Sequence, residues 1–181
     1  MLNSKKICKN YKPQEIQFKI IHILQTTPYQ RSKYDKECSG KCLRCKENTG
    51  TYVHMMWLCP KIKRFWVEIK NEISNITGVR IELDPLQCIL GLNPNLAEQN
   101  RFRRILQILW YCARLTILQH WLDEDVPSVA MWLQNVLQLL PLERLTHVLQ
   151  GDVGVFFLVW GPVVEYMGEE NAEILLRGFA N

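Results

Sequence analysis

Residues 60–78 read PKIKRFWVEIKNEISNITG and form the most strongly patterned stretch of the chain. Large apolar side chains recur in it at three- and four-residue spacing, at Ile62, Phe65, Trp66, Ile69 and Ile73. That spacing places them on one face of an α-helix, with the charged side chains on the other faces. Pro60 suits the first helical turn, where its missing N–H costs nothing, and Gly78 suits a stop. The stretch therefore predicts an amphipathic helix that packs onto a core.

The rest of the chain continues this helical pattern. Apolar spacing predicts helices over 13–24, 101–122, 128–149 and 153–167, with a short apolar piece at 86–90. Ser128 is the expected N-cap of the third of these helices, and Pro141 is expected to break or kink it. Only residues 51–53 resemble a strand. We therefore expect an all-α fold in which segment 1–78 and a helical bundle, 79–181, pack as one unit.

The predicted core follows from the same periodicity. It contains side chains from four of these helices: Phe65, Trp66, Ile69, Trp110, Trp132, Leu133 and Trp160.

A cysteine and histidine cluster lies just before the helix at 60–78. Its spacing is Cys42-x2-Cys45-x8-His54-x4-Cys59, with Gly50 where the chain must reverse. A Cys-x-x-Cys turn presents two thiolates to one ion, and Zn²⁺ takes four such ligands in a tetrahedron. The spacing predicts a small zinc-stabilised loop, and a filled four-ligand shell leaves no position for catalytic water. The alternative, in which the cysteines are ordinary thiols, stays open, as does Cys38 as a rival ligand.

Cysteine usage also bears on the compartment. The seven cysteines are an odd number, and no apolar signal region follows the polar first residues. The chain also lacks an uninterrupted 18-residue apolar run of the length that spans a bilayer. These observations favour metal binding over disulfides, no membrane contact, and an intracellular protein of the nucleus or cytoplasm.

Charge is distributed unevenly along the chain. Residues 1–90 hold 16 Lys and Arg against 8 Asp and Glu, whereas residues 91–181 hold 6 against 10. A basic end on a near-neutral body indicates a surface for a polyanion, although a well-solvated basic face would have the same composition.

Single-stranded nucleic acid is held by cations together with aromatic rings that stack on bases. The candidate contacts for RNA or single-stranded DNA are Tyr29, Arg31, Lys33, Tyr34, Lys36, Lys41, Arg44, Lys46, Lys61, Lys63 and Arg64. Trp57 lies one turn from two candidate ligands and could cover the metal, but we expect it to pack in the core and not to contact nucleic acid.

The cluster and its flanks resemble a known family. Cys42-Leu-Arg-Cys45, Gly50-Thr51, the run His54-Met-Met-Trp-Leu-Cys59-Pro60 and the following Phe65-Trp66 are similar to the C-terminal region of LINE-type non-LTR retrotransposon reverse transcriptases. The likeness covers roughly residues 14–167, and the zinc knuckle is its most specific part.

This resemblance implies a zinc-binding accessory domain of a retroelement polymerase that contacts RNA or DNA. It makes Cys42, Cys45, His54 and Cys59 the zinc ligands and carries no catalytic residue over. A reverse transcriptase needs paired aspartates for two metal ions, and the sequence contains no Asp-Asp. Whether the chain is a fragment, a decayed copy or a host-adopted protein is open.

A second function stays open beside nucleic-acid binding. The acidic, Trp-rich half could be a helical interaction module that binds a polymerase or another protein, with a purely structural zinc site. Its docking face would lie around Trp110 and Trp121. No Ser or Cys nucleophile has a recognisable partner in the sequence, so we do not expect an enzyme.

Overall fold

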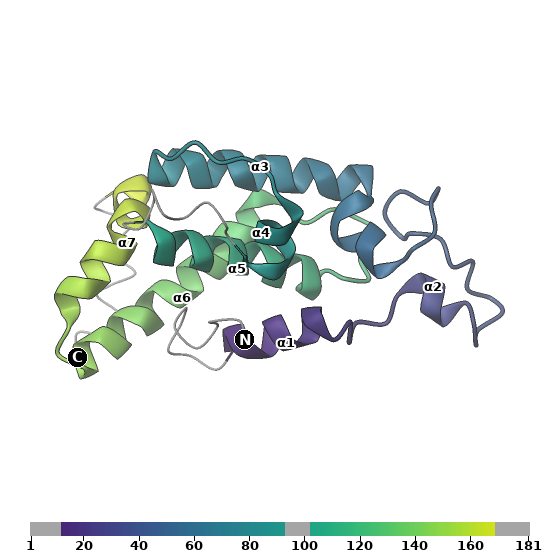
Figure 1. The fold of residues 1–181 in the computed structure, drawn as a ribbon, viewed down its shortest axis with the longest axis horizontal. Helices are drawn as coiled ribbons and strands as arrows, with labels where there is room; N and C mark the ends of the chain where they lie inside the picture. Colours follow the sequence, from purple (N-terminus) through teal and green to yellow (C-terminus); the bar gives the residue numbers. More distant parts are fainter. Residues whose placement is uncertain (1–11, 93–101, 169–181) are drawn as a thin grey trace.

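The chain folds into helices, as the sequence predicts. A computed structural model describes residues 12–92 and 102–168 (Figure 1), and within these ranges no strand forms. The helices are α1 (Lys12–Ile21), α2 (Pro28–Arg31), the π-helical turn η2 (His54–Leu58), α3 (Pro60–Thr77), α4 (Pro85–Leu90), α5 (Arg103–Gln119), α6 (Val129–Leu149) and α7 (Val153–Met167).

Helix α3 lies along one long edge of the molecule, with α5 and α6 beneath it (Figure 1). It contacts η2, α5, α6 and α7 through its apolar face. Trp66 is fully buried there, and its indole Nε1 donates to the Met56 carbonyl oxygen at 2.8 Å. Gly78 ends the helix with a φ of 66°, a left-handed conformation that glycine adopts without strain. The bounds and the buried face of α3 are as predicted.

Helices α5 and α6 pack against each other to form the rest of the core. Trp132 of α6 donates to the Leu109 carbonyl oxygen of α5 at 3.1 Å, and Asn135 donates to the hydroxyl of Thr116 at 2.9 Å. Of the predicted core side chains, all are buried except Leu133, which is half-buried. Trp110 and Trp121 are also buried, at 2% and 4% exposed. Both side chains belong to the core, as predicted for Trp110, so they do not provide the docking face that the alternative function would place around them.

Two further predictions need correction. Pro141 does not break α6, which continues through it to Leu149, and Pro162 similarly lies inside α7. Residues 51–53 are not a strand, because a helical turn begins at Tyr52 and leads into η2. The side chain of Thr51 accepts the N–H of His54 at 3.3 Å. Threonine commonly caps a helix in this way.

The loop that carries the cysteines and the C-terminal helices lie at different ends of the molecule. The loop between α2 and η2 projects at one end of the molecule, and α6 and α7 meet at the other (Figure 1). Helix α1 lies on the opposite side of the bundle from α3. Among the described residues, no helix has the length and apolar character needed to cross a membrane.

Candidate metal centre

Four side chains from three consecutive segments meet at one point. Cys42 and Cys45 come from the loop after α2, His54 opens η2, and Cys59 is the N-cap of α3. Their ligand atoms all lie within 4.8 Å of one another. Sγ of Cys42 lies 3.9 Å from Sγ of Cys59, and Sγ of Cys45 lies 3.3 Å from Nε2 of His54. These are the four residues that the spacing predicts.

The donor set fits a zinc ion. A tetrahedral shell with Zn–S bonds of about 2.3 Å places its sulfurs about 3.8 Å apart, close to the separation of the Cys42 and Cys59 sulfurs. The His54 nitrogen that faces Cys45 is Nε2, a usual ligand atom for zinc. Three thiols and one imidazole would fill all four positions. The group could therefore hold a metal ion with no coordination position left for a substrate.

Main-chain hydrogen bonds shape the loop that carries the first two cysteines. The N–H of Cys42 donates to the Asn48 carbonyl oxygen at 2.8 Å, and the N–H of Lys46 donates to the Cys42 carbonyl oxygen at 2.9 Å. Lys46 has a φ of 61°. This left-handed turn lets the chain fold back after the Cys-x-x-Cys segment. Sequence reasoning did not identify Asn48 or this turn, although a short polar side chain after a cysteine pair is a usual sign of one.

Gly50 is required where the loop returns past its own start. A Cβ added at Gly50 would lie 3.0 Å from the Pro28 side chain and 3.1 Å from the main-chain nitrogen of Cys42. Any side chain at residue 50 would therefore push the loop away from the cysteines. The chain reversal predicted at Gly50 is present.

The two cysteines of the Cys-x-x-Cys turn have different electrostatic surroundings. Burial raises the pKa of the Cys42 thiol, and the nearby Cys59 sulfur raises it further, against hydrogen bonds from the N–H groups of Cys45 and Arg44. Burial also raises the pKa of Cys45, but hydrogen bonds from the N–H groups of Asn48 and Glu47 and from His54 outweigh it and lower this pKa to about 6. Of these two thiols, Cys45 is therefore the better prepared to act as a thiolate ligand.

The second ligand pair is held by buried neighbours. Met55 and Met56 of η2 are fully buried, and the Cys59 N–H donates to the His54 carbonyl oxygen at 2.9 Å. The ring of Trp57 lies 6.1 Å from that of Trp66. Trp57 is half-buried and packs against the core, which is the role expected for it.

Arg44 does not face solvent, and its prediction as a phosphate contact is wrong. Its side chain is 1% exposed, and its guanidinium donates to the carbonyl oxygens of Met55 at 3.3 Å and His120 at 2.7 Å. Burial lowers the pKa of Arg44, while the sulfurs of Cys42 and Cys59 act in the opposite direction. Arg44 thus links the cysteine loop to the end of α5.

The other candidate nucleic-acid contacts lie at the surface. Tyr29 and Tyr34 are 43% and 72% exposed, and Lys33 Nζ lies 4.8 Å above the Tyr29 ring. Arg31 pairs with Asp35 at 3.0 Å, and Lys46 pairs with Glu124 at 2.6 Å. The remaining candidates are exposed: Lys36, Lys41, Lys61, Lys63 and Arg64.

Glu124 interacts with a cation of the cysteine loop and with one at the start of α3. The pKa of Glu124 is lowered mainly by its hydrogen bond and charge interaction with Lys46, and also by the charge of Lys61. Glu124 therefore lies near both cations. The start of α3 and the cysteine loop contribute to one basic region at this end of the molecule.

The remaining described cysteines do not join the cluster. Cys38 is not in the group of ligand atoms, and its Sγ lies 3.5 Å from the Pro28 carbonyl oxygen. Burial raises the pKa of Cys88 to about 12 and raises that of Cys112 as well. These two are buried, inert thiols.

No known protein-family profile matches the chain.

Proposed function

We propose that this protein is a non-catalytic domain that binds one zinc ion and uses the surface around it to bind single-stranded RNA or DNA. Zinc at Cys42, Cys45, His54 and Cys59 would fix the loop that presents the surrounding cations. The ion would act structurally, because the protein ligands fill its tetrahedral shell.

The observation that carries the nucleic-acid proposal is a set of exposed cations without ion-pair partners. Within the described part of the chain, Lys36, Lys41, Lys63 and Arg64 are exposed and form no salt bridge. The exposed rings of Tyr29 and Tyr34 come from the segment between α1 and the metal centre. Unpaired cations together with exposed aromatic rings are what a flexible, single-stranded polyanion requires.

The resemblance to the C-terminal zinc-knuckle region of LINE-type reverse transcriptases supports the same proposal. We propose that the chain derives from such a region and works as an accessory to a polymerase. The resemblance accounts for the order of ligands and for the aromatic pair in α3. It assigns no catalytic residue to this chain.

Salt-dependent binding to a short unstructured RNA tests this function. If about four cations contact phosphates, counterion release gives a log–log slope of affinity against salt of about −3. Replacing Lys61 and Lys63 together with Ala should flatten that slope by about 1.4 units if both contact phosphates, and should weaken all sequences alike. Arg44 is excluded from this set because it is buried.

Matched variants separate charge from stacking. Tyr34→Ala should weaken binding by roughly 5- to 100-fold and leave the salt slope unchanged, since a stacked ring releases no counterions. Lys19→Ala on α1 is the charge control, because this lysine pairs with Glu15 of the same helix and is not among the candidate contacts. Absence of binding by the zinc-loaded protein at low salt would refute the nucleic-acid proposal.

A helical interaction module remains the second candidate because of exposed apolar side chains on α6 and α7. Leu149, Phe157 and Leu158 are 78%, 52% and 73% exposed. Exposed apolar clusters on soluble domains commonly mark protein contacts. If RNA binding is absent, this surface becomes the leading candidate, and the resemblance would then describe ancestry only.

A further inference from the structure

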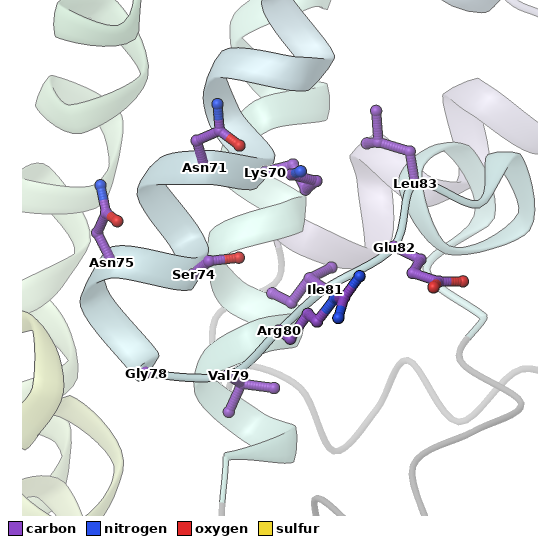
Figure 2. Close-up of a pocket in the computed structure, with 10 residues that line it drawn as sticks. All are labelled: Lys70, Asn71, Ser74, Asn75, Gly78, Val79, Arg80, Ile81, Glu82 and Leu83. Atoms are coloured by element: carbon purple, nitrogen blue, oxygen red, sulfur yellow. The ribbon is translucent and has the colours of Figure 1, made fainter.

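An open groove lies between the C-terminal half of α3 and the extended segment that follows it (Figure 2). Its volume is about 640 Å³, within the range of about 300–1,000 Å³ that small-ligand sites occupy. The lining residues are Lys70, Asn71, Ser74, Asn75, Gly78, Val79, Arg80, Ile81, Glu82 and Leu83. It is separate from the metal centre.

One wall of the groove is a stretch of main chain. Residues 79–83 all line it, although their side chains alternate: Ile81 is buried, whereas Arg80 and Glu82 are exposed. Because consecutive residues line one groove while their side chains point to opposite sides, the peptide groups themselves form this wall.

These peptide groups have unused hydrogen-bonding capacity. Among the described residues, the N–H groups of residues 80–83 and the carbonyl groups of residues 79–83 form no hydrogen bond. Such a row resembles the edge of a β-sheet, which pairs readily with another extended chain.

The polar side chains of the helical wall are spaced like alternate residues of an extended chain. Lys70 and Ser74 extend from α3 on the side that faces the extended segment (Figure 2), and neither side chain makes a hydrogen bond or ion pair with a described residue. Residues four apart on a helix are separated by about 6 Å along its axis. Two residues of an extended chain span about 6.6 Å. One extended segment could therefore meet successive partners on both walls.

The charged side chains that line the groove indicate which kind of peptide it would favour. Lys70 and Arg80 are two cations without ion-pair partners, against the single acid Glu82. An acidic side chain opposite Lys70 and Arg80 would be favoured, and a basic one repelled.

We propose that this groove binds an extended peptide segment of a partner protein that carries an acidic side chain. The peptide adds as a strand to residues 79–83, and its acidic side chain contacts Lys70 or Arg80. This site is independent of the proposed nucleic-acid surface.

Three pools of capped nine-residue peptides test the proposal against the immobilised, zinc-loaded full chain. The first has Asp at the centre with flanks randomised among Val, Ile, Thr and Ser. The second has Lys at the centre, and the third is the Asp pool with alternate main-chain nitrogens methylated. We expect the Asp pool to be retained about fivefold over the Lys pool, as one exposed ion pair allows. Methylation should abolish retention because it removes the strand hydrogen bonds.

Variants and hydrogen exchange locate the binding. Arg80→Glu should reverse the preference between the Asp and Lys pools, whereas Lys19→Glu, on α1, should not change it. The most strongly retained peptide should protect the amides of residues 80–83 from exchange. Retention of no pool, equal retention of the methylated pool, or protection confined to another segment would each overturn the proposal.

Discussion

At the scale of single residues, Arg44 joins the metal centre to the helical body. Its donors reach the carbonyl oxygen of Met55 in η2 and that of His120 at the end of α5. Its charge also lies near the sulfurs of Cys42 and Cys59. A buried cation between main-chain carbonyls and thiol groups fixes the position of the cysteine loop relative to α5.

Replacing Arg44 with Met should therefore destabilise the protein without changing the salt slope of RNA binding. Met keeps part of the apolar stem but leaves the carbonyls of Met55 and His120 without their donor. We expect the free energy of unfolding to fall by about 1.5–3 kcal/mol, the usual contribution of hydrogen bonds to a charged group. Urea unfolding at saturating zinc measures this. Unchanged stability together with a flatter RNA salt slope would contradict this and show that Arg44 is an exposed phosphate contact.

The contrast between the ligands and Arg44 shows what local sequence can predict. All four ligands lie within residues 42–59, so their spacing is enough to bring them together. Arg44 is a cation in a basic segment, which is what a phosphate contact would be. Its hydrogen-bond partner His120, however, is 76 residues away. Only tertiary packing makes this arginine a buried link, and no local pattern encodes it.

At the scale of elements, α6 continues through a proline that the sequence marks as a break. Pro141 lacks the N–H that would bond four residues back, and its ring crowds that turn. The helix nevertheless reaches Leu149, because Trp132, Val136 and Leu140 are buried on its inner face. Tertiary burial here outweighs a local helix-breaking signal. Helix α3 was predictable to its ends because apolar period, first-turn proline and terminal glycine all agree.

Pro141→Ala should stabilise the protein. A proline inside a helix costs about 3 kcal/mol, of which its rigid ring returns up to about 1 kcal/mol by restricting the unfolded chain. We expect a gain of about 2 kcal/mol in the free energy of unfolding, measured by thermal and urea denaturation. Pro162→Ala in α7 is the matched comparison and should act in the same direction. A loss of stability in Pro141→Ala would mean that the core requires the proline geometry.

At the scale of the whole molecule, the metal centre packs onto one end of the helical bundle, and Cys42 and Cys59 belong to its core. The cysteine loop joins the bundle mainly through η2, the start of α3 and Arg44. Helices α6 and α7 meet at the end of the molecule opposite the cysteine loop (Figure 1), whereas the end of α5 contacts that loop through Arg44. The sequence predicts both regions. It does not predict that the metal centre joins the bundle at the end of α5, because that depends on packing between distant segments.

Removing the metal should therefore loosen one end first. With a strong chelator, we expect residues 38–66 to gain hydrogen exchange early, whereas α5 and α6 keep most of their protection. Structural zinc in small motifs contributes roughly 10–16 kcal/mol of apparent binding energy, so its loss should unfold the loop locally. Exchange mass spectrometry follows each segment. Equal loss of protection throughout the chain would show that the metal supports the whole fold.

The most direct test of the account is native mass spectrometry of the protein prepared with zinc present. We expect one zinc ion per chain in the wild type and in Cys38→Ser, whose sulfur lies outside the ligand group. We expect loss or strong weakening of zinc binding in Cys45→Ser and His54→Ala, because each removes one of the four ligands. A wild-type chain that carries no metal, or a Cys38→Ser variant that loses zinc as completely as Cys45→Ser, would contradict the proposed zinc site.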